Sequence, residues 1–177
     1  MLEFAVQYIQ TGCKMRIIIW QFLHLLPETQ SYSIEPILYA KNEYRDSAPV
    51  CKGARGMIAI AANGNVFPCH QVSGYSEKYG DVFDNVKDTS LKSLLQDSDY
   101  LCKVCMTVDK IREHDPKCGS CPYFEYCAGG CRAIAWGLTG DVLAADPSKC
   151  LFFEGGFYEK ITQEMGEWHN LSQIVTI

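Results

Sequence analysis

Apolar side chains near the N-terminus recur at the spacing of an α-helix. They are Leu2, Ala5, Val6 and Ile9. Gly12 follows at the point where the end of a helix favours a residue with positive φ. The pattern therefore predicts an N-terminal helix that ends just before Gly12.

The longest apolar run of the chain, residues 17–26, follows this predicted helix. Gln21 and His24 interrupt the run, and it is far shorter than the ~20 residues that a membrane-spanning helix needs. We interpret the run as a buried strand and predict strand structure over residues 15–21. Because a helix followed directly by an apolar strand is typical of the closing units of a (β/α) barrel, residues 1–50 are interpreted as the remnant of such a barrel.

Residues 56–68 contain two short apolar segments on either side of Asn63-Gly64. This dipeptide is the strongest short-range signal for a β-hairpin, since both of its residues tolerate positive φ. A hairpin here would bring Cys51 and Cys69 to neighbouring positions. The glycine would thus gather two thiols that lie far apart in the sequence.

Apolar periodicity predicts three further helices. They are one capped by Asp88 with Leu91, Leu94 and Leu95 on its apolar face, one over residues 132–138 that ends at Gly140, and one that carries Ile161, Met165 and Trp168. Apolar stripes of this kind are typical of helices that face a core. Together with the predicted hairpin they indicate a small α+β fold.

The composition is that of a folded globular protein. The chain has 177 residues, of which 47% are hydrophobic and 21% charged, which suits one domain or a small domain with an appendage. Its net charge of −5 and its lack of a Lys/Arg cluster argue against nucleic acid, because phosphate recognition needs concentrated positive charge. The first ten residues show no secretory signal, so we expect a cytoplasmic protein with no membrane partner.

Ten cysteines are a large excess for a chain of this length. Disulfides, zinc and iron–sulfur clusters could each explain them. Disulfide frameworks belong to small secreted domains, whereas this sequence shows no export signal and has ample core residues. A metal centre is therefore the favoured explanation, with structural zinc as the alternative to iron and sulfide.

Seven of the cysteines fall into one ordered pattern. It is Cys51, twelve residues, Gly64, four residues, Cys69, then Cys118, Cys121, Cys127 and Cys131 at intervals of two, five and three residues, and finally Cys150. A CxxC pair can turn two thiolates towards one metal centre. The glycines before Cys131 allow the backbone to bend, so that Cys131 can point elsewhere than Cys127.

In this order the seven cysteines, Gly64 and the glycine pair before Cys131 resemble the SPASM domain. That domain is the C-terminal extension of many radical S-adenosylmethionine enzymes that modify peptides and proteins. The resemblance covers about residues 51–150. It implies a small, irregular, cysteine-rich α+β domain around two clusters at 51–150, preceded by the barrel remnant at 1–50 and followed by a C-terminal helix at 151–177, which we expect to lie over the cluster region.

The resemblance also implies two sets of ligands for two [4Fe–4S] clusters. The first cluster would be held by Cys51, Cys69 and Cys131, and the second by Cys118, Cys121, Cys127 and Cys150. The first set has only three thiolates, and its fourth ligand is left open between Cys102, Cys105, Cys13 and no protein ligand at all. We expect Cys13 to be a buried apolar residue.

Other side chains near the cysteines have two interpretations each. His70 could replace a thiolate, but we prefer a hydrogen-bonding or surface position for it. Tyr123, Phe124 and Tyr126 are expected to shield a cluster from water, with stacking on a substrate as the alternative.

The CxxxCxxC motif that holds the radical-generating cluster does not occur in this sequence. We therefore expect the chain to need a longer parent enzyme for S-adenosylmethionine cleavage, and we favour a fragment over a truncated gene product or a free-standing cluster carrier. The expected function is an auxiliary-cluster domain of a peptide- or protein-modifying radical enzyme, serving in electron transfer or substrate binding. Its expected partners are that substrate and an electron carrier. The alternative is a non-catalytic, zinc-stabilised interaction module.

Overall fold

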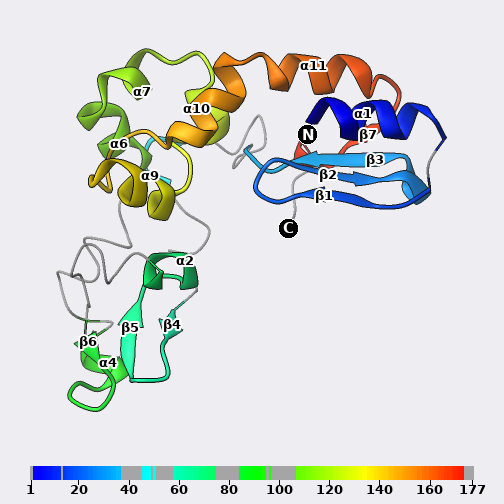
Figure 1. Cartoon of the computed structure of the whole chain (residues 1–177). Helices are drawn as coiled ribbons and strands as arrows, with labels where there is room; N and C mark the ends of the chain where they lie inside the picture. The colour runs from blue at the N-terminus through cyan, green and yellow to red at the C-terminus, as the bar shows by residue number, and fades with distance from the viewer. Residues whose placement is uncertain are drawn as a thin grey trace. The chain divides into compact units, whose positions relative to one another are not determined.

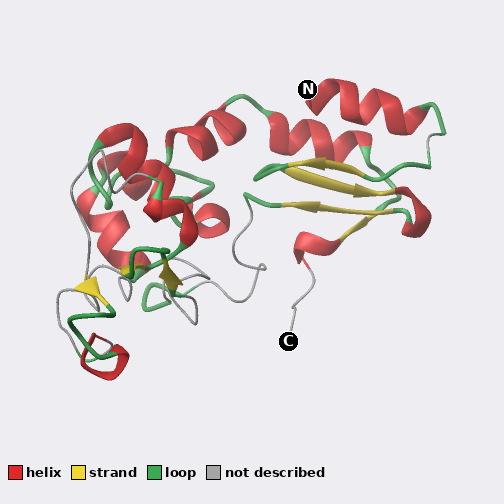
Figure 2. Ribbon diagram, turned by 60° about the horizontal axis from the view of Figure 1, so that its bottom comes forward, coloured by secondary structure: helices red, strands yellow, loops and turns green. Residues whose placement is uncertain are grey.

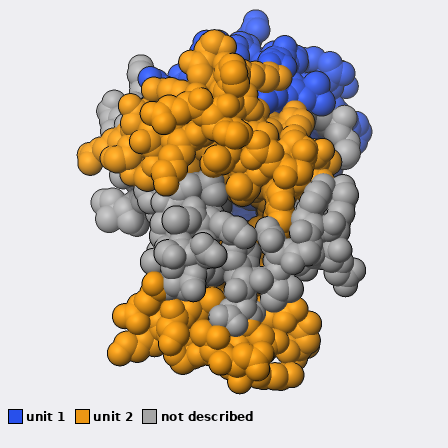
Figure 3. All heavy atoms as spheres, turned by 90° about the vertical axis from the view of Figure 1, so that its left-hand side faces the viewer, with its two compact units in different colours: residues 1–44, 122–127, 148–177 blue, residues 45–121, 128–147 orange. Residues whose placement is uncertain are grey.

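The computed structural model describes residues 2–12, 14–36, 45–48, 50, 58–74, 84–94, 96 and 107–173. In these ranges the chain forms short helices and two small sheets, which confirms the expected α+β class (Figures 1 and 2). The chain divides into two compact units, coloured separately in Figure 3. Unit 1 comprises residues 1–44, 122–127 and 148–177, and unit 2 comprises residues 45–121 and 128–147. The division into segments 1–50, 51–150 and 151–177 stays a prediction.

Unit 1 contains a four-stranded sheet in the order β1-β2-β3-β7. The strands are β1 (Ile17–Ile19), β2 (Leu23–Leu26), β3 (Ser31–Ile34) and β7 (His169–Asn170). The first three pair antiparallel, with Ile18 opposite His24 and Leu25 opposite Tyr32, and β7 pairs parallel with β3. A 3-10 turn, η1 (Pro27–Thr29), joins β2 to β3.

The apolar run at residues 17–26 therefore forms two strands, and its interpretation as one strand was wrong. The chain turns back at Gln21, which adopts a φ of +66°, and the Phe22 N–H donates to the Ile19 carbonyl at 2.9 Å. Folding back lets β2 bury Leu23 completely, while Trp20 in the turn is 68% exposed. Successive strands of a (β/α) barrel run parallel, so the antiparallel hairpin lends no support to the barrel-remnant hypothesis, which stays a prediction.

Helices cover one face of this sheet. They are α1 (Leu2–Gln10) and α11 (Phe157–Glu164), which lie side by side above the strands in Figure 1. Gly12 follows α1 with a φ of +79°, so the predicted end of the helix is confirmed. Unit 1 also contains α8 (Phe124–Cys127), the short η3 (Leu171–Gln173) and, except for its first residue, α10 (Pro147–Glu154).

The core of unit 1 joins α1, α11 and the sheet. Its buried side chains include Ala5, Leu25, Phe152, Ile161 and Met165. The predicted C-terminal helix is present in part: α11 carries Ile161 but ends at Glu164, so Met165 caps it and Trp168 lies beyond its end. Ile161 and Met165 are both buried in this core. The sequence did not indicate that α1 would be the neighbour of α11.

Unit 2 contains a three-stranded antiparallel sheet in the order β4-β5-β6. The strands are β4 (Ala59–Ile60), β5 (Asn65–Phe67) and β6 (Asp84–Asn85). The hairpin predicted around Gly64 is confirmed, and Gly64 has a φ of +94°. Asn63 keeps a negative φ, contrary to expectation, because its side chain accepts a hydrogen bond from the Asn65 N–H at 3.0 Å and closes the turn in another way.

The helices that the structure describes in unit 2 are short. They are α2 (His70–Ser73), α4 (Leu91–Leu94), α6 (Val108–His114), α7 (Pro116–Ser120) and α9 (Arg132–Thr139). The predicted helix before Gly140 is confirmed as α9, since Gly140 ends it with a φ of +81°. The prediction of Asp88 as a cap was wrong, because Ser90 lies directly before α4 and accepts from the Ser93 N–H at 3.1 Å.

No helix in the part of the chain that the structure describes has both the length and the apolar character needed to cross a membrane. The longest of them is the nine-residue α1.

Candidate metal centre

The loop between Cys127 and Cys131 has an unusual backbone. Ala128, Gly129 and Gly130 have φ values of +45°, +80° and +82°, so three consecutive residues are left-handed. The boundary between the two units falls directly after Cys127, and Cys131 belongs to unit 2. The backbone bend predicted from the glycines is thus present, and Cys127 and Cys131 lie on opposite sides of it.

Gly129 is restricted by packing as well as by conformation. A Cβ at this position would lie 2.6 Å from Ile111 Cγ2 and 2.9 Å from Arg132 Nη2. The backbone of the loop therefore approaches α6 so closely that no side chain fits between them.

Arg132 holds this loop from inside unit 2. Its side chain is buried, with 7% exposed, and its guanidinium donates to the carbonyls of Gly129, Val142 and Ala144, the last two at 2.8 Å. A guanidinium presents five donors in a rigid fork, so one side chain can join two loops. Residues 128–131 are thereby tied to residues 142–144.

Asp146 fixes the backbone of Cys131. Its fully buried carboxylate accepts from the Cys131 N–H at 2.9 Å, and its own N–H donates to the Gly129 carbonyl at 2.9 Å. Hydrogen bonds to a charged acceptor are stronger than neutral ones. The position of Cys131 is therefore set by contacts that do not involve its sulfur.

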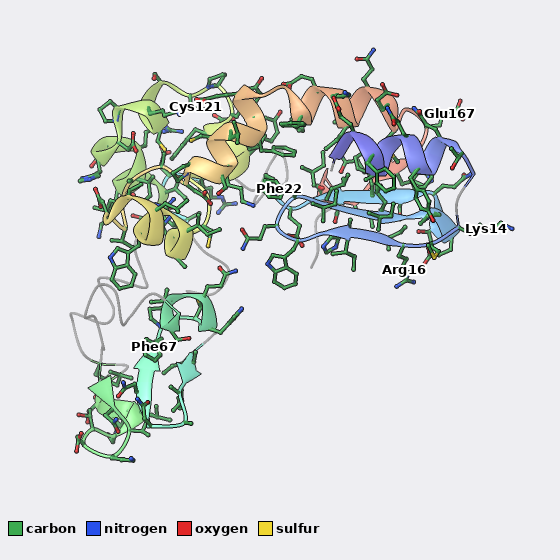
Figure 4. The ribbon with its side chains drawn as sticks, in the orientation of Figure 1. Lys14, Arg16, Phe22, Phe67, Cys121 and Glu167 are labelled. Atoms are coloured by element: carbon green, nitrogen blue, oxygen red, sulfur yellow. The ribbon has the colours of Figure 1, made fainter. Side chains whose placement is uncertain are left out.

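Cys118 and Cys121 lie at the end of α7. The Cys121 N–H donates to the Cys118 carbonyl at 3.3 Å, which confirms the tight turn expected of a CxxC pair (Figure 4 labels Cys121). Asp115 caps α7 by accepting from the Lys117 N–H at 2.9 Å, and its other oxygen accepts from the Ala145 N–H at 2.6 Å. One carboxylate thus orients the CxxC helix and anchors the loop that leads to Asp146.

Cys69 and Cys131 pack against the same small core in unit 2. This core consists of Phe67, Val72, Ala133 and Trp136. Cys69 directly precedes α2 and Cys131 directly precedes α9, so each thiol lies at the start of a helix. Within the same unit, Cys131 Sγ lies 3.1 Å from Gln71 Oε1. Two of the three sulfurs predicted for the first cluster are therefore neighbours of one core.

Cys127 and Cys150 belong to unit 1. Cys127 ends α8 and is buried in the core of this unit, whereas Cys150 lies in α10 and is half-buried. The rings of Tyr123 and Phe153 stack with centroids 5.0 Å apart, and Tyr126 packs on Tyr158 at 5.6 Å. These side chains pack against the core that contains Cys127, as shielding requires, although their role at a cluster stays a prediction.

The described histidines occupy ordinary positions. His70 is exposed at the start of α2, which fits the preferred surface interpretation. His24 faces Glu35 at 2.7 Å, and His114 faces Asp141 at 2.7 Å. Burial opposes ionisation of Asp141, but hydrogen bonds from the Leu143 N–H and from His114 outweigh it, so the pKa of this carboxyl is lowered from its ordinary value.

The described part of the chain supplies donors of the kind that a thiolate-bound cluster uses. Cys69, Cys118, Cys121, Cys127, Cys131 and Cys150 are present as thiols. Within the described ranges, no three His, Cys, Asp or Glu side chains converge closely enough to hold a metal ion. The predicted third thiol, Cys51, lies outside these ranges, as do Cys13, Cys102 and Cys105. The ligand assignments therefore stay predictions.

Sequence reasoning missed the residues that position the cysteines. Asp115 and Asp146 each precede a proline at the start of a helix, a pairing that is typical of helix N-termini and could have indicated them. Arg132 and Gln71 carry no comparable local signal, because Arg132 reaches the Val142 carbonyl ten residues away and Gln71 meets the Cys131 sulfur sixty residues away.

Comparison with known families confirms the resemblance found from the cysteine spacing. Residues 51–122 match the model of SPASM, an iron–sulfur cluster-binding domain. The chain is similar to an AdoMet-dependent heme synthase of Oleidesulfovibrio alaskensis, with 34% identity over 55% of this chain and 22% of the relative. It is also similar to a PqqA peptide cyclase of Methylocella silvestris, with 35% identity over 55% of this chain and 25% of the relative.

A heme synthase of Nitratidesulfovibrio vulgaris matches in the same way, with 33% identity over 55% of this chain and 23% of the relative. The chain spans about a quarter of the length of these curated relatives. No solved structure matches it.

Proposed function

We propose, on the premise that residues 51–122 are a SPASM iron–sulfur cluster-binding domain, that the chain holds two [4Fe–4S] clusters as the auxiliary part of a radical S-adenosylmethionine enzyme. The observation that carries this proposal is the common core of Cys69 and Cys131. These two thiols are distant in the sequence. The glycine-closed hairpin leads to Cys69 and the left-handed loop leads to Cys131, and we infer that the two turns serve to bring the thiols to the same core.

The proposed ligands follow the two sets of the resemblance. Cys51, Cys69 and Cys131 hold the first cluster, and its fourth ligand is Cys102, Cys105, Cys13 or no protein residue. Cys118, Cys121, Cys127 and Cys150 hold the second cluster. When bound, such clusters supply one-electron transfer, and an iron with no protein ligand supplies a binding site for substrate.

The chain's own residues orient the ligands and exclude water. Asp146 fixes the backbone of Cys131, and Arg132 holds the Gly129 carbonyl of the preceding loop, so the Cys131 thiol is held in place before metal binds. Tyr123 and Tyr126 keep water from Cys127 by packing on Phe153 and Tyr158. Burial and hydrogen bonding are the means by which a protein sets the reduction potential of a cluster.

The proposed substrate is a peptide or protein, in keeping with the PqqA peptide cyclases among the relatives. The proposed redox partner is an external electron carrier, and the proposed location is the cytoplasm. S-adenosylmethionine would be cleaved only by a longer parent enzyme, whose own motif would hold the third cluster.

Metal analysis of anaerobically prepared chain tests the proposal. We expect about eight irons and about eight acid-labile sulfides per chain, and about four of each after Cys69→Ser. His70→Ala, an exposed neighbour in α2, is the matched control and should keep the full content. Stoichiometric zinc without sulfide would instead support the interaction module and end the proposal.

A further inference from the structure

We propose that Gln71 donates a hydrogen bond to the thiolate of Cys131 in the loaded protein and thereby raises the reduction potential of the first cluster. This inference rests on the proposed function. It begins from one contact in unit 2, the 3.1 Å distance between Cys131 Sγ and Gln71 Oε1. Gln71 is thus a positioning and tuning residue rather than a ligand.

The backbone brings these two side chains together. Gln71 is the second residue of α2, two positions after Cys69, and Cys131 is the residue directly before α9. The two helices pack on each other, and Val72 of α2 and Trp136 of α9 share one core. The contact is therefore fixed by two elements that also carry two proposed ligands.

The position of Cys131 is set by contacts that do not involve Gln71. The Asp146 carboxylate holds the Cys131 N–H at 2.9 Å, and the Arg132 guanidinium holds the Gly129 carbonyl of the preceding loop. Replacing Gln71 should accordingly leave the position of the thiol unchanged. Its effect on the sulfur can then be separated from an effect on folding.

The protonation state of the sulfur decides the direction of the hydrogen bond. In the metal-free chain the Cys131 thiol donates its proton to Gln71 Oε1. Iron binding requires the thiolate, so this proton leaves to solvent and the sulfur becomes an acceptor only. A half-turn of the carboxamide then places Nε2–H where Oε1 was, and the two groups are nearly equal in size.

A donor at this position withdraws electron density from the sulfur and favours the reduced state. The N-terminus of the eight-residue α9 acts in the same sense, since its partial positive charge stabilises a thiolate at Cys131. The two contributions differ in origin, and only the first depends on the side chain of Gln71.

The test compares cluster potentials by EPR-monitored redox titration of the reconstituted chain. Gln71→Met keeps the length of the side chain but lacks the donor, so we expect one of the two potentials to become more negative at unchanged iron content. Gln71→Glu replaces the donor by a negative charge and should move that potential further in the same direction. Repeating Gln71→Met in the Cys150→Ser background assigns the shift to the first cluster. His70→Ala, from the same helix, should move neither potential.

Two results would overturn the inference. One is a Gln71→Met chain with full iron and both potentials unchanged. The other is a loss of about four irons in Gln71→Met, which would make Gln71 a structural residue or a ligand. Zinc or missing sulfide in the unsubstituted chain is a different failure, because it ends the proposed function before any variant is compared.

Discussion

At Gly129 two separate restrictions act on one residue. Its φ of +80° is unfavourable for any side chain, and the space that a Cβ would need is occupied by Ile111 and Arg132. Neither neighbour can retreat easily, because Ile111 is fully buried and the Arg132 guanidinium donates to four backbone carbonyls. The loop before Cys131 therefore tolerates only glycine here.

Gly129→Ala should destabilise the chain by about 2–4 kcal/mol, since left-handed strain and overpacking add. Urea unfolding measures the change. Gly74→Ala is the matched control in the same unit, because Gly74 has a φ of −70° and a Cβ there would meet only the Gln71 carbonyl at 3.5 Å. Equal effects of the two substitutions would show that the left-handed loop imposes no such restriction.

Asp141 predicts a pH dependence. Its folded-state pKa lies below its ordinary value of 3.8, because bonds from Leu143 and His114 outweigh the effect of burial. A lowered pKa means that the ionised carboxylate stabilises the fold fully above the unfolded pKa, and that this contribution disappears as the pH falls through the folded pKa. The substitution Asp141→Asn removes the stabilisation that the ionised carboxylate contributes at neutral pH.

The difference in unfolding midpoint between the original chain and Asp141→Asn should therefore be largest near pH 6 and should shrink below about pH 4. Urea titrations of both metal-free chains across this range measure it, and metal-free protein is needed because acid releases sulfide. A difference that stays constant down to pH 3 would contradict the assignment.

At the scale of elements, short helices in unit 2 depend on their caps. Helices α7 and α4 have five and four residues, too few to be stable through helix propensity alone. The Asp115 carboxylate accepts hydrogen bonds from the Lys117 N–H at the start of α7 and from the Ala145 N–H. Ser90 caps α4 in the same way by accepting from the Ser93 N–H. The orientation of Cys118 and Cys121 follows from the capping of α7.

Asp115→Ala should cost about 2 kcal/mol or more, because it removes a cap and leaves the Ala145 N–H without this acceptor. Thermal or urea unfolding of the reconstituted chain measures the loss. Asp88→Ala is the control, since Asp88 lies exposed in a turn, and its effect should stay within about 0.5 kcal/mol. A larger effect for Asp88 would reinstate it as a capping residue.

At the scale of the whole molecule, the proposed clusters would link cysteines that lie far apart in the sequence. The proposed ligands span residues 51–150, so metal binding would close long loops that only the folded chain can close. Many of the elements between them are four or five residues long. Metal binding should accordingly stabilise the folded chain, and folding should in turn increase the affinity for metal.

Removal of iron by an anaerobic chelator should lower the melting temperature by roughly 10 °C or more. Calorimetry or circular dichroism before and after removal measures the shift, and reconstitution with iron and sulfide should reverse it. An unchanged melting temperature after complete loss of iron would show that the fold is independent of the clusters.

The sequence by itself determined the features that depend on local order. The spacing of seven cysteines identified the SPASM resemblance. Apolar periodicity, with a glycine after each helix, predicted α1 and α9, and the Asn63-Gly64 dipeptide predicted the hairpin. These are local because helix periodicity, positive φ and tight turns involve residues within a few positions of one another.

Only the tertiary structure decided the features that depend on distant partners. The apolar run at 17–26 became two strands because folding back buries Leu23 and Leu25, which no local pattern distinguishes from one longer strand. Arg132 and Gln71 acquired their roles through carbonyls and a thiol on other segments of the chain. Such contacts follow from which elements pack together, and packing is a property of the folded chain rather than of any short stretch of it.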